Sequence, residues 1–307
     1  MKIIFMVCVS LITLFANKLE VTVSIVPQKY FVEKIAQDKV NVNVMVLPGF
    51  SPATYEPKTS QMKSLAQSSV YFSIGVPFEN VWLERFKSAN KSLNIVDTSR
   101  GITKALMQEH HHEEEHEEEH KHDHEEHQHH EHDNEKKDEH DEHAHNGLDP
   151  HIWVDPLLVK QQAKTIYETL VALDKRHAAF YQANYENFLK ELDALYLELK
   201  TILAPIKNKA FMVFHPSWGY FATRFNLEQI AVEVLGKEPK PNQLIALIEE
   251  AKEHNIKTVF VSPEFSQKSA KVIASSIGGK VVSITSLSLQ WKENLIFAAH
   301  SIVDSHR

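Results

Sequence analysis

Short apolar runs alternate with stretches of helical spacing along the first hundred residues. The runs are rich in β-branched residues and end in turn-forming residues, which is typical of strands. They lie at 21–27, 42–49, 70–76 and 93–99. Between them, 30–37 and 59–67 place apolar residues three and four positions apart, as short helices do. Strands that alternate with helices predict βαβ units and a parallel sheet.

The last hundred residues repeat this alternation. Strands are predicted at 209–217, 227–236, 256–264 and 280–287. Helices are predicted at 220–226, 241–255, 266–279 and 291–307. The chain therefore contains two regions of the same α/β class.

A different pattern separates these regions, between Pro156 and about Leu203. Apolar residues recur at helical spacing without an interior proline or glycine, and Pro205 ends the pattern. It predicts one long helix, or two helices with a bend near 174–177. About forty residues of continuous helix would run about 60 Å, longer than one small domain, so such a helix would connect two lobes.

The predicted fold class is α/β, with two Rossmann-like lobes that contain parallel sheets and are joined by a long rigid interlobe helix. The predicted domains are a signal peptide, an N-terminal lobe, a linking helix and a C-terminal lobe. Their ranges are 1–16, 17–155, 156–204 and 205–307, and a disordered loop at 108–146 interrupts the N-terminal lobe.

The N-terminus predicts export. Lys2 precedes an apolar run from Ile3 to Phe15, and Ala16 is a suitable cleavage position. At about 13 residues the run is too short to span a bilayer, which needs about 20. An N-terminal core strand is the other reading. The single cysteine, Cys8, lies in this segment, so a processed chain would hold any metal through histidine or oxygen ligands.

The composition supports a folded protein with an unevenly placed charge. Of the 307 residues, 43% are hydrophobic, which is enough for a sizeable core. The formal charge is −8, yet 109–142 contains 17 acidic residues against 3 lysines, so the remainder of the chain is net positive. No dense patch of lysine and arginine occurs in the sequence, so nucleic-acid binding is not expected.

The acidic segment is also rich in histidine. Fourteen of the chain's 20 histidines fall between His110 and His145, and this stretch has no apolar periodicity, so we expect a disordered surface loop at 108–146. Neutral imidazole and carboxylate bind zinc in many exchangeable arrangements. A role in metal capture is expected, with a solvated acidic loop as the alternative. The candidate residues are His110, His111, His112, His116, His120, His122, His124, His127, His129, His130, His132, His140, His143 and His145.

Two further histidines lie at predicted element boundaries. His151 lies in GLDPHIWVDP between Pro150 and Pro156, and His215 lies where an apolar strand ends in FMVFHPS. Either histidine alone could be structural. Because ligands in open α/β sheets sit beyond the carboxyl ends of strands, the pair predicts a shared metal site in which the two approach each other across an interlobe cleft.

At this point the sequence resembles a known family. The segments VLPGFSPATYEPK, GLDPHIWVDP, FHPSWGYF, GKEPKPNQL and VFVSPEFSQKSAKVIASSIGGKVVSI, with the histidine-rich insertion, are similar to the metal receptor of bacterial high-affinity zinc ABC importers. The resemblance extends over nearly the whole chain after 1–16. It implies a periplasmic receptor that captures Zn²⁺ and delivers it to a membrane permease, without catalysis.

The resemblance also implies metal ligands, of which only two are present. The histidine of the family's DPH.W motif matches His151, and that of its strand-ending FH motif matches His215. The family's first histidine is replaced here by Ala53, and an aspartate that many members place after the last strand is replaced by Thr285. A tight zinc site uses about four ligands, or three and a water, so the set is incomplete.

Three completions of the site remain open. A nearby carboxylate such as Glu56 or Glu264 could contribute, although Glu56 also reads as a helix-start residue and Glu264 as a solvated turn residue. The histidine-rich segment could supply imidazoles. The cleft could also bind metal weakly and serve another task.

The predicted function is therefore a monomeric zinc receptor whose partners are Zn²⁺ and a membrane permease. A Mn²⁺ or iron receptor of the same class is less favoured, because such sites use more carboxylate. A periplasmic zinc buffer or chaperone with a degenerate cleft is a further alternative. A hydrolase is not expected, because a catalytic zinc needs three protein ligands, an open position and a general base.

Overall fold

The computed structural model describes residues 18–107, 147–207, 209–234 and 236–307. The predicted signal peptide and the histidine-rich segment lie outside these residues. The chain divides into two compact units, which are described separately below. The first comprises Met1–Arg100 with Lys160–Glu191, and the second comprises Gly101–Val159 with Leu192–Arg307.

The first unit is built on a parallel four-stranded sheet. Its strands are β1 (Leu19–Val23), β2 (Val40–Val44), β3 (Val70–Ser73) and β4 (Asn94–Asp97). Their order across the sheet is β2-β1-β3-β4, and every pairing is parallel. The order reverses direction between β1 and β3, which is the arrangement of a doubly wound sheet.

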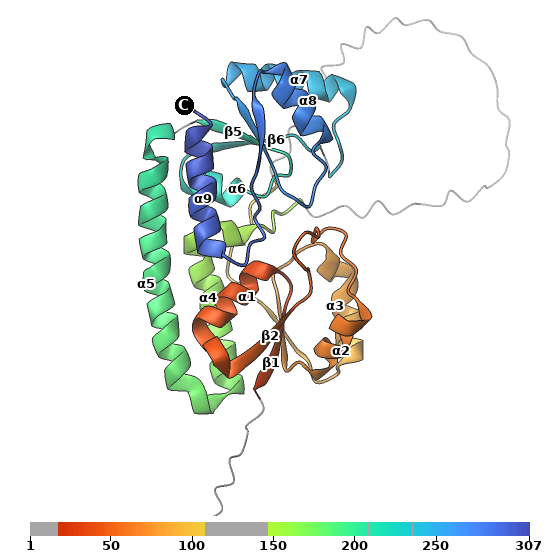
Figure 1. The fold of residues 1–307 in the computed structure, drawn as a ribbon. Helices are drawn as coiled ribbons and strands as arrows, with labels where there is room; N and C mark the ends of the chain where they lie inside the picture. The colour runs from red at the N-terminus through yellow and green to blue at the C-terminus, as the bar shows by residue number, and fades with distance from the viewer. Residues whose placement is uncertain (1–17, 108–146, 208, 235) are drawn as a thin grey trace, which may run out of the picture. The chain divides into compact units, whose positions relative to one another are not determined.

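Three helices connect these strands. They are α1 (Val26–Ala36), α2 (Thr59–Gln67) and α3 (Phe78–Ala89). Helix α1 lies on one side of the sheet, and α2 and α3 lie together on the other (Figure 1). The sequence patterns above did not predict α3, although Phe78, Trp82 and Phe86 recur at four-residue spacing along it and two of them are buried.

The predicted linking segment forms two helices, α4 (Pro156–Leu173) and α5 (Ala178–Leu203). The chain bends at Asp174, whose carboxylate accepts hydrogen bonds from His177 Nδ1 at 2.6 Å and from the Tyr181 hydroxyl at 3.0 Å. Of the two arrangements that the pattern allowed, the structure therefore has the bent one. The boundary between the two units falls inside both helices.

The second unit contains another parallel four-stranded sheet. Its strands are β5 (Ala210–Val213), β6 (Glu228–Ala231), β7 (Thr258–Val261) and β8 (Lys280–Ser283), in the order β6-β5-β7-β8. Its helices are α6 (Gly219–Arg224), α7 (Pro241–Glu253), α8 (Lys268–Ser276) and α9 (Trp291–Asp304). Short 3-10 turns in the chain lie at Gln37–Lys39, Ile152–Val154, Lys175–His177 and Ala204–Ile206.

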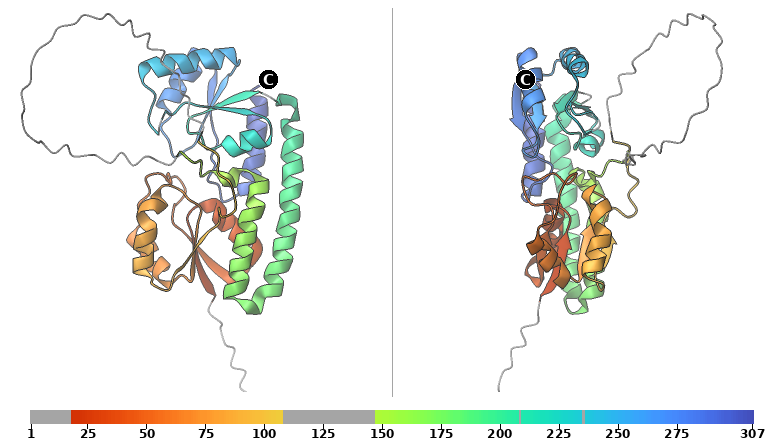
Figure 2. Two further views of the ribbon diagram at one scale, coloured as in Figure 1. Left: turned by 180° about the vertical axis from the view of Figure 1, so that it is seen from behind. Right: turned by 90° about the vertical axis from the view of Figure 1, so that its right-hand side faces the viewer.

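The core of the second unit follows from strand periodicity. Alternate residues of β5, Ala210 and Met212, pack with α7 and α8, and Phe211 between them contacts Phe260 of β7 through their rings. The views in Figure 2 show α7 and α8 together on one side of this sheet. The central strands β5 and β7 are buried on both faces, which explains their continuous apolar runs.

The strands end earlier than the sequence predicts. The predicted strand 227–236 contains only four paired residues of β6, and the chain then turns through an isolated bridge between Val234 and Lys237. Single backbone hydrogen bonds continue just beyond the strand ends, where the loops begin, as from Val232 N to Val213 O at 2.8 Å. These loop starts form the carboxyl edge of the sheet.

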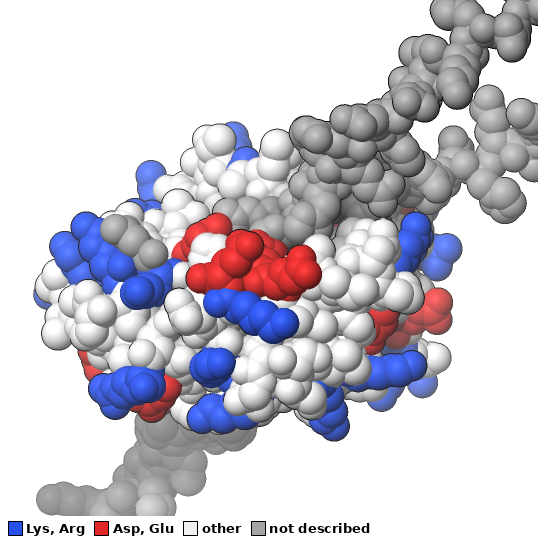
Figure 3. All heavy atoms as spheres, turned by 90° about the horizontal axis from the view of Figure 1, so that it is seen from above, with Lys and Arg blue, Asp and Glu red and all other residues white. Residues whose placement is uncertain are grey.

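The surface carries charges of both signs. On the face in Figure 3, acidic side chains form a group near the centre and smaller ones at the margin, with lysine and arginine side chains between and around them. Among the described residues, no helix combines the length and apolar character that crossing a membrane would require.

A buried carboxylate holds the carboxyl edge of the first sheet together. Glu79 accepts hydrogen bonds from the backbone of Gly75 at 2.8 Å and of Ile74 at 3.1 Å, and from the Ser24 hydroxyl. These donors follow β3 and β1, so one side chain links both central strands. Burial raises the pKa of Glu79 from its ordinary 4.5 to about 7, against the lowering effect of these hydrogen bonds.

This burial predicts that the first unit loses stability as the pH rises. A raised folded-state pKa contributes stability that is fully present below the unfolded value near 4.5 and is lost as the pH passes through about 7. The difference between pH 5 and pH 8 is roughly 3 kcal/mol. Urea unfolding of metal-free protein at both pH values measures it, and the dependence should be smaller by this amount in Glu79→Gln.

The control is Glu84→Gln, which removes an exposed carboxylate from the same helix. It should keep the pH dependence of the parent. An equal pH dependence in the parent and in Glu79→Gln would contradict the assignment.

Candidate metal site

His215 lies at the carboxyl edge of the second sheet. It follows β5 by two residues, and Phe214 N donates to Phe260 O at 2.7 Å, which fixes the chain just before it. Ser217 N donates to His215 O at 2.7 Å, so the chain turns directly after the histidine. The strand therefore delivers the imidazole to the sheet edge where ligands bind in this fold class.

His151 belongs to the same unit. An antiparallel bridge between Leu106 and Leu148 joins the two chain segments that flank 108–146. The Tyr220 hydroxyl of α6 donates to Asp149 O at 2.9 Å. Both contacts fix the segment that leads to His151 within the second unit. The expectation that the two histidines face each other from different lobes is therefore wrong, because this segment folds with the second sheet.

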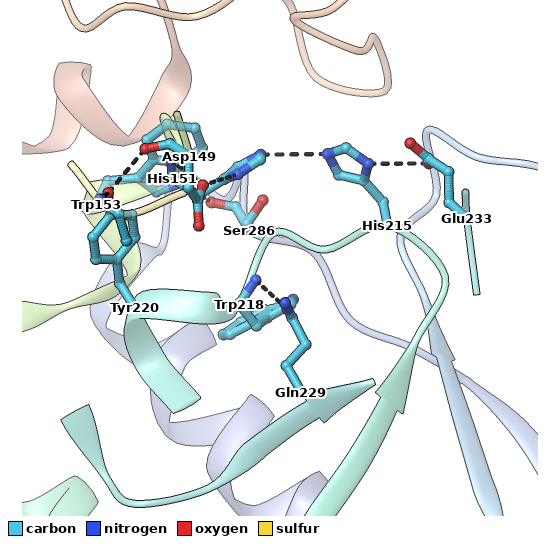
Figure 4. A network of polar contacts seen from close by, with 10 residues as sticks. Asp149, His151, Trp153, His215, Trp218, Tyr220, Gln229, Glu233 and Ser286 are labelled. Carbon is cyan, nitrogen blue, oxygen red and sulfur yellow. Dashed lines mark hydrogen bonds and ion pairs between the residues drawn. The ribbon is translucent and has the colours of Figure 1, made fainter. Parts of the chain in front are cut away.

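The two imidazoles point their Nε2 atoms at each other. These atoms are 3.4 Å apart, and the rings cross at 74° (Figure 4). Each Nδ1 faces a carboxylate instead: His151 contacts Asp149 at 2.6 Å, and His215 contacts Glu233 at 3.0 Å. A neutral imidazole that donates Nδ1–H to a carboxylate has its lone pair on Nε2. Two lone pairs therefore converge on one point.

Burial favours the neutral form of His151. The side chain is almost completely buried, and this desolvation lowers its pKa. The nearby carboxylates of Asp149 and Glu233 act in the opposite direction, whereas the neighbouring His215 lowers the pKa further. The neutral form is the one that binds metal.

Aromatic side chains enclose the pair. The Trp153 ring lies 5.0 Å from the His151 ring, and Phe265 stacks on His215 with 4.6 Å between ring centroids. Trp153 is itself held by a hydrogen bond from Nε1 to Ser286 O at 2.8 Å. Such an apolar wall limits the access of water and keeps the imidazoles in place.

The other residues predicted from the sequence belong to both units. Ala53 and Glu56 are exposed in the first unit, between β2 and α2. Glu264 and Thr285 lie in the second unit and contact each other at 3.4 Å. Among the described residues, no group of three or more His, Cys, Asp or Glu is placed to hold a metal ion. The fourteen histidines of the 108–146 segment lie outside the described residues.

Sequence reasoning missed Asp149 and Glu233. Asp149 stands two residues before His151 and bonds both its ring and its backbone N–H, a local arrangement that the spacing D-P-H could have suggested. Glu233 meets His215 because the register pairs Val213 with Ala231, and both side chains follow that pair by two residues. Only the strand pairing brings them together, so no local signal existed.

Comparisons with known proteins agree with a metal-binding role. The model of the family described as zinc-uptake complex component A, periplasmic (ZnuA) matches residues 21–294. The high-affinity zinc uptake system protein ZnuA of Bacillus subtilis is 30% identical over 287 residues, which cover 90% of this chain and 81% of that protein. A putative metal-binding protein of Treponema pallidum is 26% identical over 92% of this chain and 83% of its own length.

Solved structures share the fold over nearly the whole chain. A crystal structure of ZnuA superposes with a TM-score of 0.81 at 38% identity and covers 95% of this chain and all of that one. A ZnuA variant with residues 138–173 of its own numbering deleted, solved with zinc bound, gives a TM-score of 0.79 at 39% identity, over 94% of this chain and 98% of that one.

The carboxylate partners predict a testable effect on metal binding. Glu233→Ala removes the acceptor of His215 Nδ1–H, so the ring loses its fixed tautomer. We expect the affinity of the tightest Zn²⁺ site to fall about 10–100-fold, which is typical for the loss of a partner behind a ligand. Competition with a chelator measures the affinity, and ¹⁵N NMR of the metal-free protein reports the tautomer.

Glu228→Ala, which truncates an exposed glutamate of β6, is the matched control and should bind zinc as the parent does. Unchanged affinity in Glu233→Ala, with Nε2 of His215 still unprotonated, would show that Glu233 does not orient the ring.

Proposed function

Because this chain belongs to the ZnuA family, the periplasmic components of zinc-uptake complexes, we propose that it captures Zn²⁺ and delivers it to the permease of a high-affinity ABC importer. Zinc is the cargo of this protein. The proposed action is binding and handover, with no catalytic step. The chain is proposed to reach the periplasm through the signal peptide at 1–16 and to work there as a monomer.

The convergence of two imidazole lone pairs carries this proposal. In a tetrahedral zinc site with bonds of about 2.0–2.1 Å, two ligand nitrogens lie about 3.3 Å apart. The Nε2 atoms of His151 and His215 are separated by 3.4 Å. Their facing lone pairs repel each other unless a proton or a metal ion lies between them, so a cation is favoured at this point.

The flanking carboxylates add to the attraction for a cation. Asp149 and Glu233 each contact the far nitrogen of one imidazole and increase the basicity of the ligand. Both carboxylates are at most 9% exposed, so water screens their charge little. The arrangement provides two zinc ligands with fixed orientations, and further ligands must complete the coordination.

The histidine-rich segment is proposed to assist capture. Its flanking residues are fixed by hydrogen bonds from Met107 N to Gly147 O and from Asp149 N to Ala105 O. The anchored chain therefore resumes at Gly147, four residues before His151. A short tether keeps its fourteen imidazoles at a high local concentration near the pair.

The alternative functions have less support. A manganese or iron receptor would use more carboxylate than the two imidazoles supply. The hypothesis of a zinc buffer without a permease rested on Ala53 and Thr285, the two positions at which the resemblance implies replaced ligands. The relatives that are described as zinc uptake proteins favour the importer receptor instead.

The test compares the pair with the histidine-rich segment. The double change His151→Ala with His215→Ala should abolish the tightest Zn²⁺ site and leave several weak equivalents. Deletion of 109–145 should remove most of the bound equivalents with little effect on folding. Zinc titrations of both variants at pH 7.5 and 5.5 separate the two contributions, because protonation of histidines with ordinary pKa values near 6.5 weakens their binding.

If the double variant binds zinc as tightly as the parent, the pair is not the receptor site. A deletion variant that keeps the full stoichiometry and affinity would assign no capture role to the segment. A single-site control, His254→Ala, changes a histidine at the end of α7 and should leave both classes of site intact.

A further inference from the structure

A buried amide near Asp149 has a donor that is not yet accounted for. Gln229 is the second residue of β6 and is 3% exposed. Its Oε1 accepts from Trp218 N at 2.7 Å, which fixes the orientation of the amide and makes Nε2 its donor end. Among the described residues, this buried Nε2 has no hydrogen-bond partner. Because an unpaired buried donor is costly, an acceptor is expected close to it.

Asp149 directs its two carboxylate oxygens to different places. Oδ1 accepts from the backbone N–H of His151 at 2.9 Å and contacts the ring Nδ1 at 2.6 Å. Oδ2 faces Gly219, because a side-chain carbon on that glycine would lie 3.0 Å from this oxygen. The same carbon position lies 3.7 Å from Gln229 Nε2. One point beside Gly219 is therefore close to both a donor and an acceptor.

Gly219 keeps this point clear of side-chain atoms. A water there needs only a small displacement toward the amide to accept from Gln229 Nε2 while it donates to Asp149 Oδ2. Waters that bridge buried polar groups in this way are nearly as favourable as direct hydrogen bonds. Figure 4 shows the Gln229 side chain reaching Trp218 below Asp149 and His151.

We propose that Gln229 is a positioning residue of the zinc site, which acts on His151 through a water beside Gly219 and through Asp149. The inference rests on the proposed function, because it concerns how a ligand of that metal is oriented. Trp218 N holds the amide oxygen of Gln229, and the amide nitrogen holds the water. The water holds Asp149 Oδ2, and Asp149 Oδ1 holds the Nδ1–H of His151.

This relay gives β6 a role for both imidazoles. Glu233, two residues beyond the end of β6, contacts His215 Nδ1 directly at 3.0 Å. Gln229, within the same strand, reaches His151 through Asp149. A carboxylate that is held at Oδ2 resists rotation away from the ring that its Oδ1 contacts, so the tautomer of His151 stays fixed. One strand therefore orients the Nε2 atoms of both histidines.

The test changes Gln229 to methionine in the full chain, which keeps an unbranched side chain of similar length and removes the donor. In the metal-free protein, ¹⁵N NMR should show part of His151 in the tautomer with a proton on Nε2. His215 should keep its tautomer, because its partner is Glu233. The affinity of the tightest Zn²⁺ site, measured by chelator competition, should fall about 5-fold, less than the 10–100-fold typical of a direct partner.

A second variant, Gly219→Ala, breaks the relay at a different place. Its methyl group occupies the bridging position, and the contact of Gln229 with Trp218 N is kept. It should produce the same change of tautomer at His151. In the double variant with Gln229→Met the losses of zinc affinity should not add, because both changes interrupt one relay. Gln290→Met, the same change at an exposed residue before α9, is the matched control and should behave as the parent.

The outcomes distinguish the relay from a general structural role of Gln229. A parent-like tautomer of His151 in whichever of the two single variants folds would overturn the inference. Additive losses in the double variant would overturn it as well, as would a change of tautomer that His215 shares.

The proposed function fails on a different result. Parent-like zinc binding in the variant His151→Ala with His215→Ala would overturn the receptor site. The tautomer of His151 in the metal-free protein tests the relay without reference to zinc, so the two failures are separable.

Discussion

Two carboxylate–imidazole hydrogen bonds fix the orientation of His151 and His215. Each one occupies the Nδ1 atom of a histidine, so each leaves Nε2 as an acceptor directed at the other ring. Without them the imidazoles could rotate or exchange tautomers, and the meeting point of the lone pairs would be lost. The metal-binding role proposed for the pair therefore depends on residues that would not touch the metal.

The surrounding chain is arranged to hold these carboxylates. A side-chain carbon on Gly219 would lie 3.0 Å from Asp149 Oδ2, closer than such contacts usually come, so glycine at this position gives that carboxylate room. The Tyr220 hydroxyl accepts from Ala105 N and donates to Asp149 O, which fixes the backbone on both sides of the 108–146 segment. Glu233 is fixed more simply, through its N–H to Phe214 O at 2.9 Å. Helix α6 thus positions Asp149, and the residue that follows strand β5 positions Glu233.

The sequence predicted most of the fold because its signals are local. Apolar runs with β-branched residues marked all eight strands, and only their ends were misplaced. Helix α3 was not predicted, because it mixes apolar and charged residues over a short span. His151 and His215 were identified from their motifs. Glu233 could not be, because its contact depends on which strands pair and in which register, and that is decided by packing of the whole sheet.

The bridge between Leu106 and Leu148 has a consequence for how such a protein can vary. It closes the fold at the base of the 108–146 segment, so the scaffold is the same whatever is inserted beyond it. The entropic cost of closing a loop grows by only about 0.6 kcal/mol for each doubling of its length. A change in the length or histidine content of residues 108–146 therefore leaves the bridge that anchors the segment before His151 in place.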